Sequence, residues 1–339
     1  MQNYFEEIKK WQNNQKKVAI ARVIKTWGSS PRPVGSVMLV NEEGKMAGSV
    51  SGGCVEGSVV KKSLEIMDSG TATKLAFGVS DEDAWSVGLS CGGSIQVFLE
   101  NFDLSPGSIW STVMDSLDKN ESCTLITSLE EGQNRSLLIK PDGSQLGENM
   151  PEPILEEAHR AFQQRANTSA EFEGVSYFIQ VFPRKPTLLI IGAAHITVDL
   201  VSLGNSFDFE TIVIDPRGYF AQNTVFPDAP AQLLEDYPSE VLEQFTLDPY
   251  TFCAILSHDP KIDDNALEIL LPSEVGYIGA LGSKKTHAKR TARLLEKGID
   301  QALIDKIHAP IGVSIHAKSA REIALSIISQ IIQVKNQHL

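Results

Sequence analysis

Two of the four cysteines in this sequence stand beside paired glycines, and they are the residues whose types and spacing most clearly suggest chemistry. Glycines let a backbone approach a ligand closely, and a thiolate at the start of a helix is favoured by the helix dipole. Such a thiolate is a good ligand for a soft metal or for sulfur, although a neighbouring carboxylate, Glu56, opposes it. The alternative is a small buried side chain in a tight turn, because most free cysteines are buried and inert. The two motifs are Gly52-Gly53-Cys54 and Cys91-Gly92-Gly93.

A second group of reactive side chains follows the apolar segments of the C-terminal half. Such residues meet at one edge if the segments are parallel strands of one sheet, because ligands bind at the carboxyl ends of the strands. Lysines and a glycine at a helix start suit a phosphate, whereas a solvated helix face is the alternative for the basic run 284–293. The group comprises His195, Asp215, Arg217, Ser257, His258, Asp259, Gly282, Ser283, Lys284 and Lys285.

The turn after the first of these segments resembles a dinucleotide-binding fingerprint only in part. Its three glycine positions are occupied by Gly192, Ala194 and Thr197, so a methyl group stands where a pyrophosphate needs bare backbone. Asp215 follows at the ~20-residue spacing of the acidic residue that accepts from a ribose hydroxyl. A Rossmann-like domain that binds another ligand, or none, is therefore as good an interpretation as a nucleotide site.

The bulk composition limits the class of partner. A net charge of −13 and a pI near 5.0 argue against nucleic acid or an anionic membrane as the main partner. No apolar segment approaches the ~18 residues of a membrane span, and the N-terminus has no leader pattern, so we expect a cytoplasmic protein. The cysteines form no C-x-x-C pair, which excludes a zinc ribbon and favours reduced thiols.

The elements that must position these residues fall into two parts, as 339 residues suggest. Residues 1–183 alternate short strand patterns with turns and have two helix patterns, one from Cys54 to a stop at Gly70 and one across 151–167. No internal repeat is evident. A proline-bracketed linker at 183–186 leads into 184–339, where buried strands alternate with helices. We predict an α/β protein with an N-terminal β-rich α+β domain and a C-terminal Rossmann-like doubly wound parallel sheet.

Several ordered segments resemble the XdhC/CoxI accessory proteins of molybdenum hydroxylases. The resemblance covers nearly the whole chain and is far more specific than any one segment. In the N-terminal part it rests on TWGSSPRPVGSVMLV, GSVSGGCVEGSVV and GLSCGGSIQVFLE, and in the C-terminal part on LLIIGAAH, VIDPR, LSHDPKID, GALGSKK and IHAPIGVSIHAKSAREIALSII.

This resemblance implies a protein that binds the molybdenum cofactor, as molybdopterin or its dinucleotide form. It implies support of cofactor sulfuration and delivery to xanthine dehydrogenase or a related hydroxylase, with a cysteine desulfurase as a further partner and a homodimer as the assembly. Cys54 would contact molybdenum or the transferred sulfur, with Cys91 secondary. The remaining cofactor contacts would be Arg32, Gly52, Gly53, Gly92, Gly93, Gly192, Ala193, Ala194, His195, Asp215, Arg217, His258, Asp259, Gly282, Ser283, Lys284 and Lys285.

Two other functions remain open at this point. An NAD(P)- or nucleotide-dependent oxidoreductase keeps the fold and Asp215 but lacks the glycine pattern, and a ligand-free docking adaptor needs none of the crevice residues. Whether the chain turns over a substrate is likewise open. A complete xanthine dehydrogenase is excluded, because four isolated cysteines cannot hold two [2Fe–2S] clusters.

Overall fold

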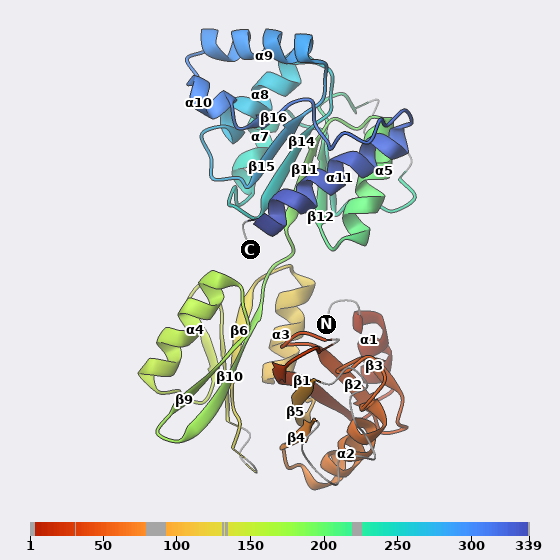
Figure 1. Cartoon of the computed structure of the whole chain (residues 1–339), viewed down its shortest axis with the longest axis vertical. Helices are drawn as coiled ribbons and strands as arrows, with labels where there is room; N and C mark the ends of the chain where they lie inside the picture. The colour runs from red at the N-terminus through yellow and green to blue at the C-terminus, as the bar shows by residue number, and fades with distance from the viewer. Residues whose placement is uncertain are drawn as a thin grey trace. The chain divides into compact units, whose positions relative to one another are not determined.

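The computed structural model divides the chain into two compact units, Met1–Arg184 and Lys185–Leu339, which are described separately (Figure 1). It describes residues 4–30, 32–78, 93–130, 132, 135–218 and 226–337. Among the helices in these ranges, none has the length and apolar character needed to cross a membrane.

The first unit begins with a helix and a five-stranded antiparallel sheet, which we call repeat 1. Its strands follow the order β3-β2-β1-β5-β4, and the helix predicted after Cys54 ends at Ser69 with Gly70 in the left-handed conformation. The elements are α1 (Phe5–Asn13), β1 (Val18–Trp27), β2 (Val37–Asn41), β3 (Met46–Gly48), α2 (Glu56–Ser69), β4 (Thr73–Phe77) and β5 (Ser94–Asn101).

The rest of the first unit, which we call repeat 2, has the same sequence of elements and the same strand order, β8-β7-β6-β10-β9. The sequence shows no such repeat, and helices α1 and α3 and strands β8 and β9 were not predicted. The elements are α3 (Ile109–Asp118), β6 (Cys123–Ser128), β7 (Ser136–Ile139), β8 (Gln145–Gly147), α4 (Glu152–Gln164), β9 (Thr168–Phe172) and β10 (Val175–Phe182).

One pair of glycines shows how closely the two repeats correspond. Gly48 and Gly147 end the third strand of each repeat, and both have positive φ angles, of 89° and 119°. In each case a Cβ atom would collide with the carbonyl oxygen of the first residue of the second strand, Val37 or Ser136. Equivalent positions therefore require glycine for the same reason, which is a close backbone approach.

The two repeats pack against each other through a shared apolar core and a buried arginine. Trp11 of α1 and Trp110 of α3 belong to one apolar cluster with residues of both sheets. Arg22 of β1 is completely buried, and its Nη2 atom donates to Glu100 Oε1 at 2.6 Å and to Thr127 Oγ1 of repeat 2 at 3.0 Å. This guanidinium thus joins the repeats.

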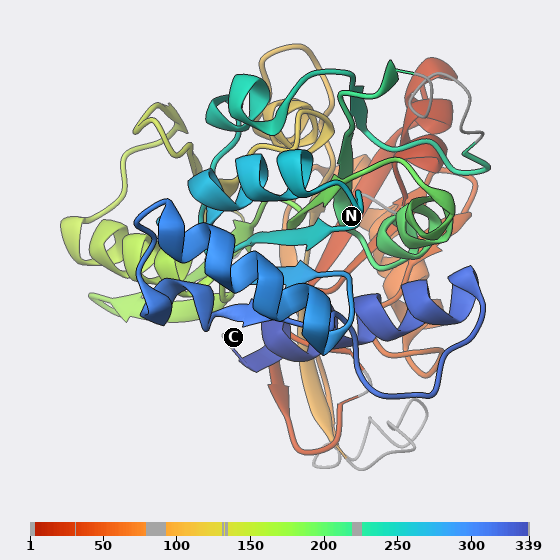
Figure 2. The same cartoon turned by 90° about the horizontal axis from the view of Figure 1, so that it is seen from above.

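The second unit is a doubly wound parallel sheet of six strands in the order β13-β12-β11-β14-β15-β16 (Figures 1 and 2). Counted from β11, this is the 3-2-1-4-5-6 order of a Rossmann-like domain, as predicted. Helices α5 and α11 pack on one face, and α7, α8, α9 and α10 pack on the other. The bounds are β11 (Thr187–Ile191), α5 (His195–Ser206), β12 (Glu210–Ile214), β13 (Gln232–Leu234), α7 (Pro238–Val241), η3 (Leu242–Gln244), β14 (Thr251–Ile255), α8 (Pro260–Leu270), β15 (Tyr277–Ala280), α9 (Lys284–Glu296), α10 (Gln301–Ile304), β16 (Ile307–His308) and α11 (Ala320–Gln337).

The sheet is buried on both faces because its strands are almost continuously apolar. Every residue of β11, β14 and β15 is buried, and so is every residue of β12 after the first. Helix α11 begins with a capping box, in which Glu322 accepts from the backbone N–H of Ser319 at 2.9 Å and Ser319 Oγ accepts from the N–H of Glu322 at 3.3 Å.

Candidate functional site

Three loops leave the same end of the sheet of repeat 1. Strands β1, β3 and β4 run in one direction, because each is antiparallel to a strand that separates it from the next. The loops at their carboxyl ends are 28–36 with Arg32, 49–55 with Cys54, and 78–93 with Cys91. The topology therefore brings Arg32 and the Gly52-Gly53-Cys54 motif to one end of one sheet.

The last two of these connections are longer than their counterparts in repeat 2. There, β8 connects to α4 through residues 148–151 only, and β9 connects to β10 through residues 173 and 174. Repeat 2 shows that the fold closes without the longer connections. The residues that carry the cysteines are thus not needed to complete the sheet.

The Cys54 loop is held by the carboxylate of Glu56, the first residue of α2. Oε1 accepts from the hydroxyl of Ser49 at 2.6 Å and from the N–H of Ser51 at 2.9 Å, and Oε2 accepts from the hydroxyl of Ser51 at 2.5 Å and from the N–H of Gly53 at 2.9 Å. Burial alone would raise the pKa of Glu56, but these hydrogen bonds outweigh it and hold the pKa at about 2. Glu56 is therefore ionised at neutral pH and organises the loop.

The glycines before Cys54 have a conformational role. Gly52 and Gly53 have φ angles of 79° and 122°, which other residues rarely adopt. A Cβ atom on Gly53 would meet nothing within 4 Å, so backbone conformation and not crowding requires a glycine there. The turn leaves Cys54 half-buried at the edge of the apolar cluster beneath α2.

The position of Glu56 changes the electrostatic argument for a Cys54 thiolate. Its carboxylate accepts from N–H groups of the loop that precedes α2 and from that of the N-cap residue Val55, at 3.2 Å. The negative charge offsets the positive end of the helix dipole where Cys54 lies. The dipole alone therefore gives a thiolate little support, and the case for Cys54 depends on its accessibility and its loop.

The remaining candidate residues at this end of the sheet are Arg32 and Gly93. Arg32 is exposed, and Gly93 packs so closely on the 28–36 loop that a Cβ atom would lie 2.5 Å from the carbonyl oxygen of Ser29. Cys91 and Gly92 lie outside the described residues.

Cys123 and Cys253 are buried in strands β6 and β14. Burial raises the pKa of Cys123 to about 12 and raises that of Cys253 still further. Both thiols are therefore protonated and inert at neutral pH, which contrasts with the half-buried Cys54.

In the second unit, the Gly192 turn is shaped by packing. A Cβ atom on Gly192 would lie 2.6 Å from Cα of Ser257, and the residue has a φ angle of 109°. Ala193 is fully buried, Ala194 is half-buried and His195 is exposed at the first position of α5. The glycine thus accommodates the neighbouring strand end, which explains its presence without a pyrophosphate.

Both carboxylate oxygens of Asp215 accept hydrogen bonds from other groups of the protein. It is fully buried, and it accepts from the N–H of Ala193 at 2.7 Å and from Arg217 Nη2 and Nε at 2.8 and 2.9 Å. Burial would raise the pKa of Asp215, but these hydrogen bonds lower it below its usual value. Both oxygens are used, so the ribose contact expected from its spacing is disfavoured, and Asp215 instead positions Arg217.

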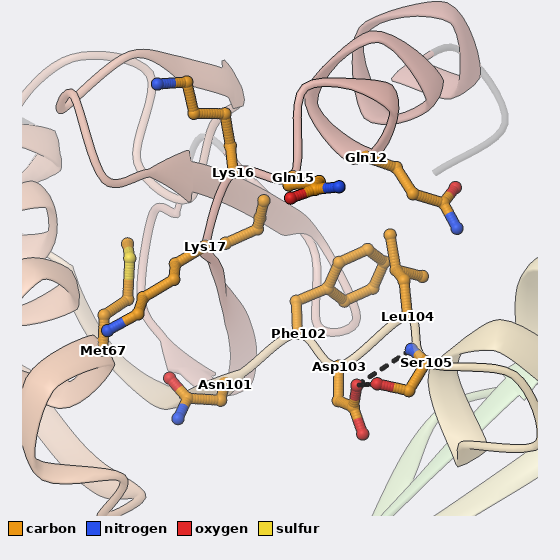
Figure 3. Close-up of a pocket in the computed structure, with 11 residues that line it drawn as sticks. Gln12, Gln15, Lys16, Lys17, Met67, Asn101, Phe102, Asp103, Leu104 and Ser105 are labelled. Atoms are coloured by element: carbon orange, nitrogen blue, oxygen red, sulfur yellow. Dashed lines mark hydrogen bonds between the residues drawn. The ribbon is translucent and has the colours of Figure 1, made fainter.

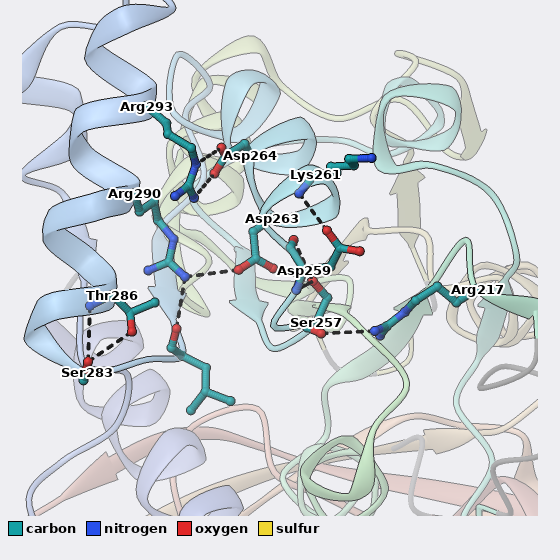
Figure 4. A network of polar contacts seen from close by, with 11 residues as sticks. Arg217, Ser257, Asp259, Lys261, Asp263, Asp264, Ser283, Thr286, Arg290 and Arg293 are labelled. Atoms are coloured by element: carbon teal, nitrogen blue, oxygen red, sulfur yellow. Dashed lines mark hydrogen bonds and ion pairs between the residues drawn. The ribbon is translucent and has the colours of Figure 1, made fainter.

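A polar network joins the ends of β12, β14 and β15 (Figure 4). Arg217 Nη1 donates to the carbonyl oxygen of Ser257 at 3.2 Å, and Ser257 Oγ donates to Asp263 at 2.6 Å. Asp263 in turn accepts from Arg290 Nη2 at 3.1 Å. Residues far apart in the sequence are thus brought together at the carboxyl edge of the sheet, where the sequence predicted a crevice.

A pocket of about 250 Å³ lies at this edge, between α8 and α9. His258, which has a φ angle of 62°, and Lys285 line it as predicted candidates. Its other charged lining residues were not predicted as ligand contacts, although the spacing of the three basic ones along α9 could have revealed them. They are Asp263, Lys289, Arg290 and Arg293.

The remaining candidates serve as caps or lie at the rim. Asp259 caps α8 by accepting from the N–H of Lys261 at 2.9 Å, and Ser283 caps α9 by accepting from the N–H of Thr286 at 3.2 Å. A Cβ atom on Gly282, whose φ is 134°, would lie 2.9 Å from Thr286 Cγ2. Lys284 is exposed and does not line the pocket.

A cavity of about 590 Å³ in the first unit has no comparable chemistry (Figure 3). It lies where β1 begins and β5 ends, which is the end of the sheet opposite the Cys54 loop. Its Lys16 is paired with Glu42 and Glu43. The described residues of the two units contain no group of three or more His, Cys, Asp or Glu side chains that could hold a metal ion.

Comparison with known families decides the identity of the fold. Residues 11–78 match the model of the XdhC and CoxI family, and residues 188–331 match the model of the XdhC Rossmann domain. The chain belongs to the XdhC and CoxI family. The matched ranges of this XdhC-type chain include the Arg32 and Cys54 loops and the whole polar network of the second unit.

Relatives and a solved structure agree with this assignment. The XdhC-type chain is 27% identical to a probable xanthine dehydrogenase subunit of Bacillus subtilis, over 99% of both chains. It is 25% identical to the molybdenum cofactor insertion chaperone PaoD of Escherichia coli, over 94% of this chain and 84% of PaoD. A crystal structure described as a xanthine dehydrogenase from Bacillus halodurans superimposes with a TM-score of 0.75 at 29% identity and covers 98% of this chain and 95% of its own.

Proposed function

We propose that this chain binds the molybdenum cofactor as cargo, supports its sulfuration, and delivers it to xanthine dehydrogenase or a related molybdenum hydroxylase. The family and the relatives support this, since one relative is a molybdenum cofactor insertion chaperone and another is named as a probable xanthine dehydrogenase subunit. A cysteine desulfurase would supply the sulfur, and the working assembly would be a homodimer in the cytoplasm.

The Cys54 loop is the observation that carries the proposal. It is three residues longer than the corresponding connection of repeat 2, it is held in shape by an ionised carboxylate, and it presents a half-buried thiol. A soft thiol suits molybdenum or a transferred sulfur better than it suits hard cations. In this role Cys54 contacts the cargo, with Arg32 on a neighbouring loop of the same end and Cys91 as a secondary contact.

The second unit would hold the phosphate or nucleotide part of the cargo. Arg217, which Asp215 and Ser257 position, and the 282–285 segment at the start of α9 supply positive charge at the carboxyl edge of the sheet. This fits an anionic group, because lysine and arginine form charge-assisted hydrogen bonds to phosphate oxygens. Either molybdopterin or its dinucleotide form has such a group.

An NAD(P)-dependent oxidoreductase has less support. A ribose would need an oxygen of Asp215, and both oxygens already accept hydrogen bonds. The second glycine position of the fingerprint is Ala194, whose methyl group would meet a pyrophosphate. A ligand-free adaptor predicts that client binding survives the loss of every crevice residue.

The test is retention and transfer of the cofactor. The full chain and its Cys54→Ser and Cys123→Ser variants are loaded with molybdenum cofactor, freed of excess by gel filtration, and analysed for bound molybdenum and for activation of a cofactor-free hydroxylase. We expect Cys54→Ser to lose most retention and activation, since serine keeps the size but is a harder, far less acidic ligand. Cys123→Ser is the matched control in the same unit, and equal behaviour of the two variants would refute the role of Cys54.

A further inference from the structure

Helix α9 places an unusual concentration of positive charge beside the pocket in the second unit. The pocket is lined by four basic side chains, Lys285, Lys289, Arg290 and Arg293, against one acidic side chain, Asp263. The chain as a whole has a net charge of −13, so the charge of this cluster is opposite in sign to that of the chain. Local positive charge on an acidic protein requires a specific explanation.

Two of these charges are compensated within the protein. Arg293 forms a two-pronged pair with Asp264, with Nε and Nη2 donating to Oδ2 and Oδ1 at 2.6 and 2.9 Å. Arg290 Nη2 donates to Asp263 Oδ2 at 3.1 Å. Lys285 and Lys289 form no ion pair with the described residues of the unit, so their charges remain for another group.

Arg290 is also incompletely satisfied. Its side chain is only 2% exposed, yet its Nε and Nη1 atoms have no acceptor among the residues that the structure describes. A buried donor without an acceptor costs free energy, and native proteins keep few of them. Figure 4 shows this guanidinium between Asp263 and the N-terminal turn of α9. An acceptor supplied by a ligand would explain both the burial and the open donors.

The start of α9 adds donors to the same place. The helix has 13 residues, and the first backbone N–H groups of a helix lack acceptors within the helix. Ser283 satisfies the N–H of Thr286. Lys285 and Thr286, from the first turn, line the pocket together with Arg290. Burial and the charge of Arg290 lower the pKa of the adjacent His287, which is consistent with excess positive charge here.

We infer that this pocket is a binding site for a phosphate or diphosphate group, with Lys285 and Lys289 as its outer charges and Arg290 as its buried charge. The site is separate from the Gly192 turn, where a Rossmann-like domain would be expected to hold a pyrophosphate. A tetrahedral dianion suits it better than a carboxylate, because it offers enough oxygens for two ammonium groups and a helix start together. The inference deepens the proposed function and rests on it for the source of the phosphate, because Lys285 belongs to the segment proposed there to hold the cargo, whereas pyrophosphate binding tests the pocket without testing cofactor delivery.

The experiment measures binding of inorganic pyrophosphate and inorganic phosphate to the full chain by calorimetry, alongside the melting temperature with each. The pocket variant carries Lys285→Gln and Lys289→Gln. The matched control carries Lys306→Gln and Lys318→Gln, which remove the same charge from exposed positions of the same unit that do not line the pocket. All four side chains are exposed, so both variants should fold.

We expect pyrophosphate to bind the parent and raise its melting temperature, and we expect the pocket variant to bind about tenfold or more weakly because it loses two charge-assisted contacts. The control should stay within about twofold of the parent, since charges outside a contact are screened. Equal weakening of both variants would show a general charge effect, and absence of pyrophosphate binding by the parent would show that there is no phosphate site. Binding of polyglutamate without pyrophosphate would assign the cluster to an acidic protein partner. Each of these three results overturns the inference.

Discussion

Glu56→Gln tests whether one carboxylate organises the Cys54 loop. The substitution keeps the size of the side chain and removes its charge. The amide NH₂ group of glutamine would then lie against N–H and O–H donors of the loop, to which it cannot act as an acceptor. The folded pKa of about 2 compared with the ordinary 4.5 corresponds to about 3 kcal/mol, at ~1.36 kcal/mol for each pKa unit. This value is the upper limit for the decrease in the free energy of unfolding of the first unit at pH 7.

The sign of the pH dependence follows from the direction of this shift. A carboxylate whose pKa is lowered in the folded state contributes stability that is fully present above its unfolded pKa. That contribution is lost as the pH falls from the ordinary 4.5 toward the folded value of about 2. The stability difference between the parent and Glu56→Gln should therefore be largest above pH 5 and should narrow as the pH approaches 2.

The assay is urea unfolding followed by tryptophan fluorescence, which reports on the first unit because all four tryptophans, at positions 11, 27, 85 and 110, lie in it. Glu65→Gln on the same helix is the matched control, since Glu65 is an exposed partner of Lys62 and contributes little. Glu56→Gln should also alter the alkylation rate of Cys54. A loss below about 0.5 kcal/mol at pH 7, or a difference that does not change with pH, would refute the role assigned to Glu56.

Three further outcomes follow from the structure. Arg22→Met should destabilise the first unit by about 3–5 kcal/mol because it leaves Glu100 buried without its partner, and the same fluorescence assay would measure this. Gly192→Ala should destabilise the second unit whether or not a ligand binds, because its Cβ atom would lie 2.6 Å from Ser257, and a melting temperature equal to the parent's would contradict the packing role. Cys253 should resist thiol reagents until the second unit unfolds, as it is completely buried, and mass spectrometry of alkylated native protein would detect any earlier reaction.

The sequence alone determined the class of the second unit and most strands of the first. Parallel strands buried on both faces appear as continuous apolar segments, such as 187–191 and 251–255, and they alternate with helical patterns. These signals are local. The Gly52-Gly53-Cys54 turn was equally visible, because a left-handed backbone requires glycine at the residue itself.

Only the tertiary structure revealed the duplication in the first unit and the hydrogen-bond and ion-pair partners of the charged residues. Repeats 1 and 2 share strand order without an evident sequence repeat, because many apolar side chains can fill the same core. The spacing of Asp215 suggested a ribose contact, but the chain folds Arg217 and Ala193 onto its oxygens. Arg290 looked like part of a solvated helix face, but α8 brings Asp263 to it and buries it. Hydrogen-bond partners and burial depend on which elements pack together, and residue spacing along one segment does not contain that information.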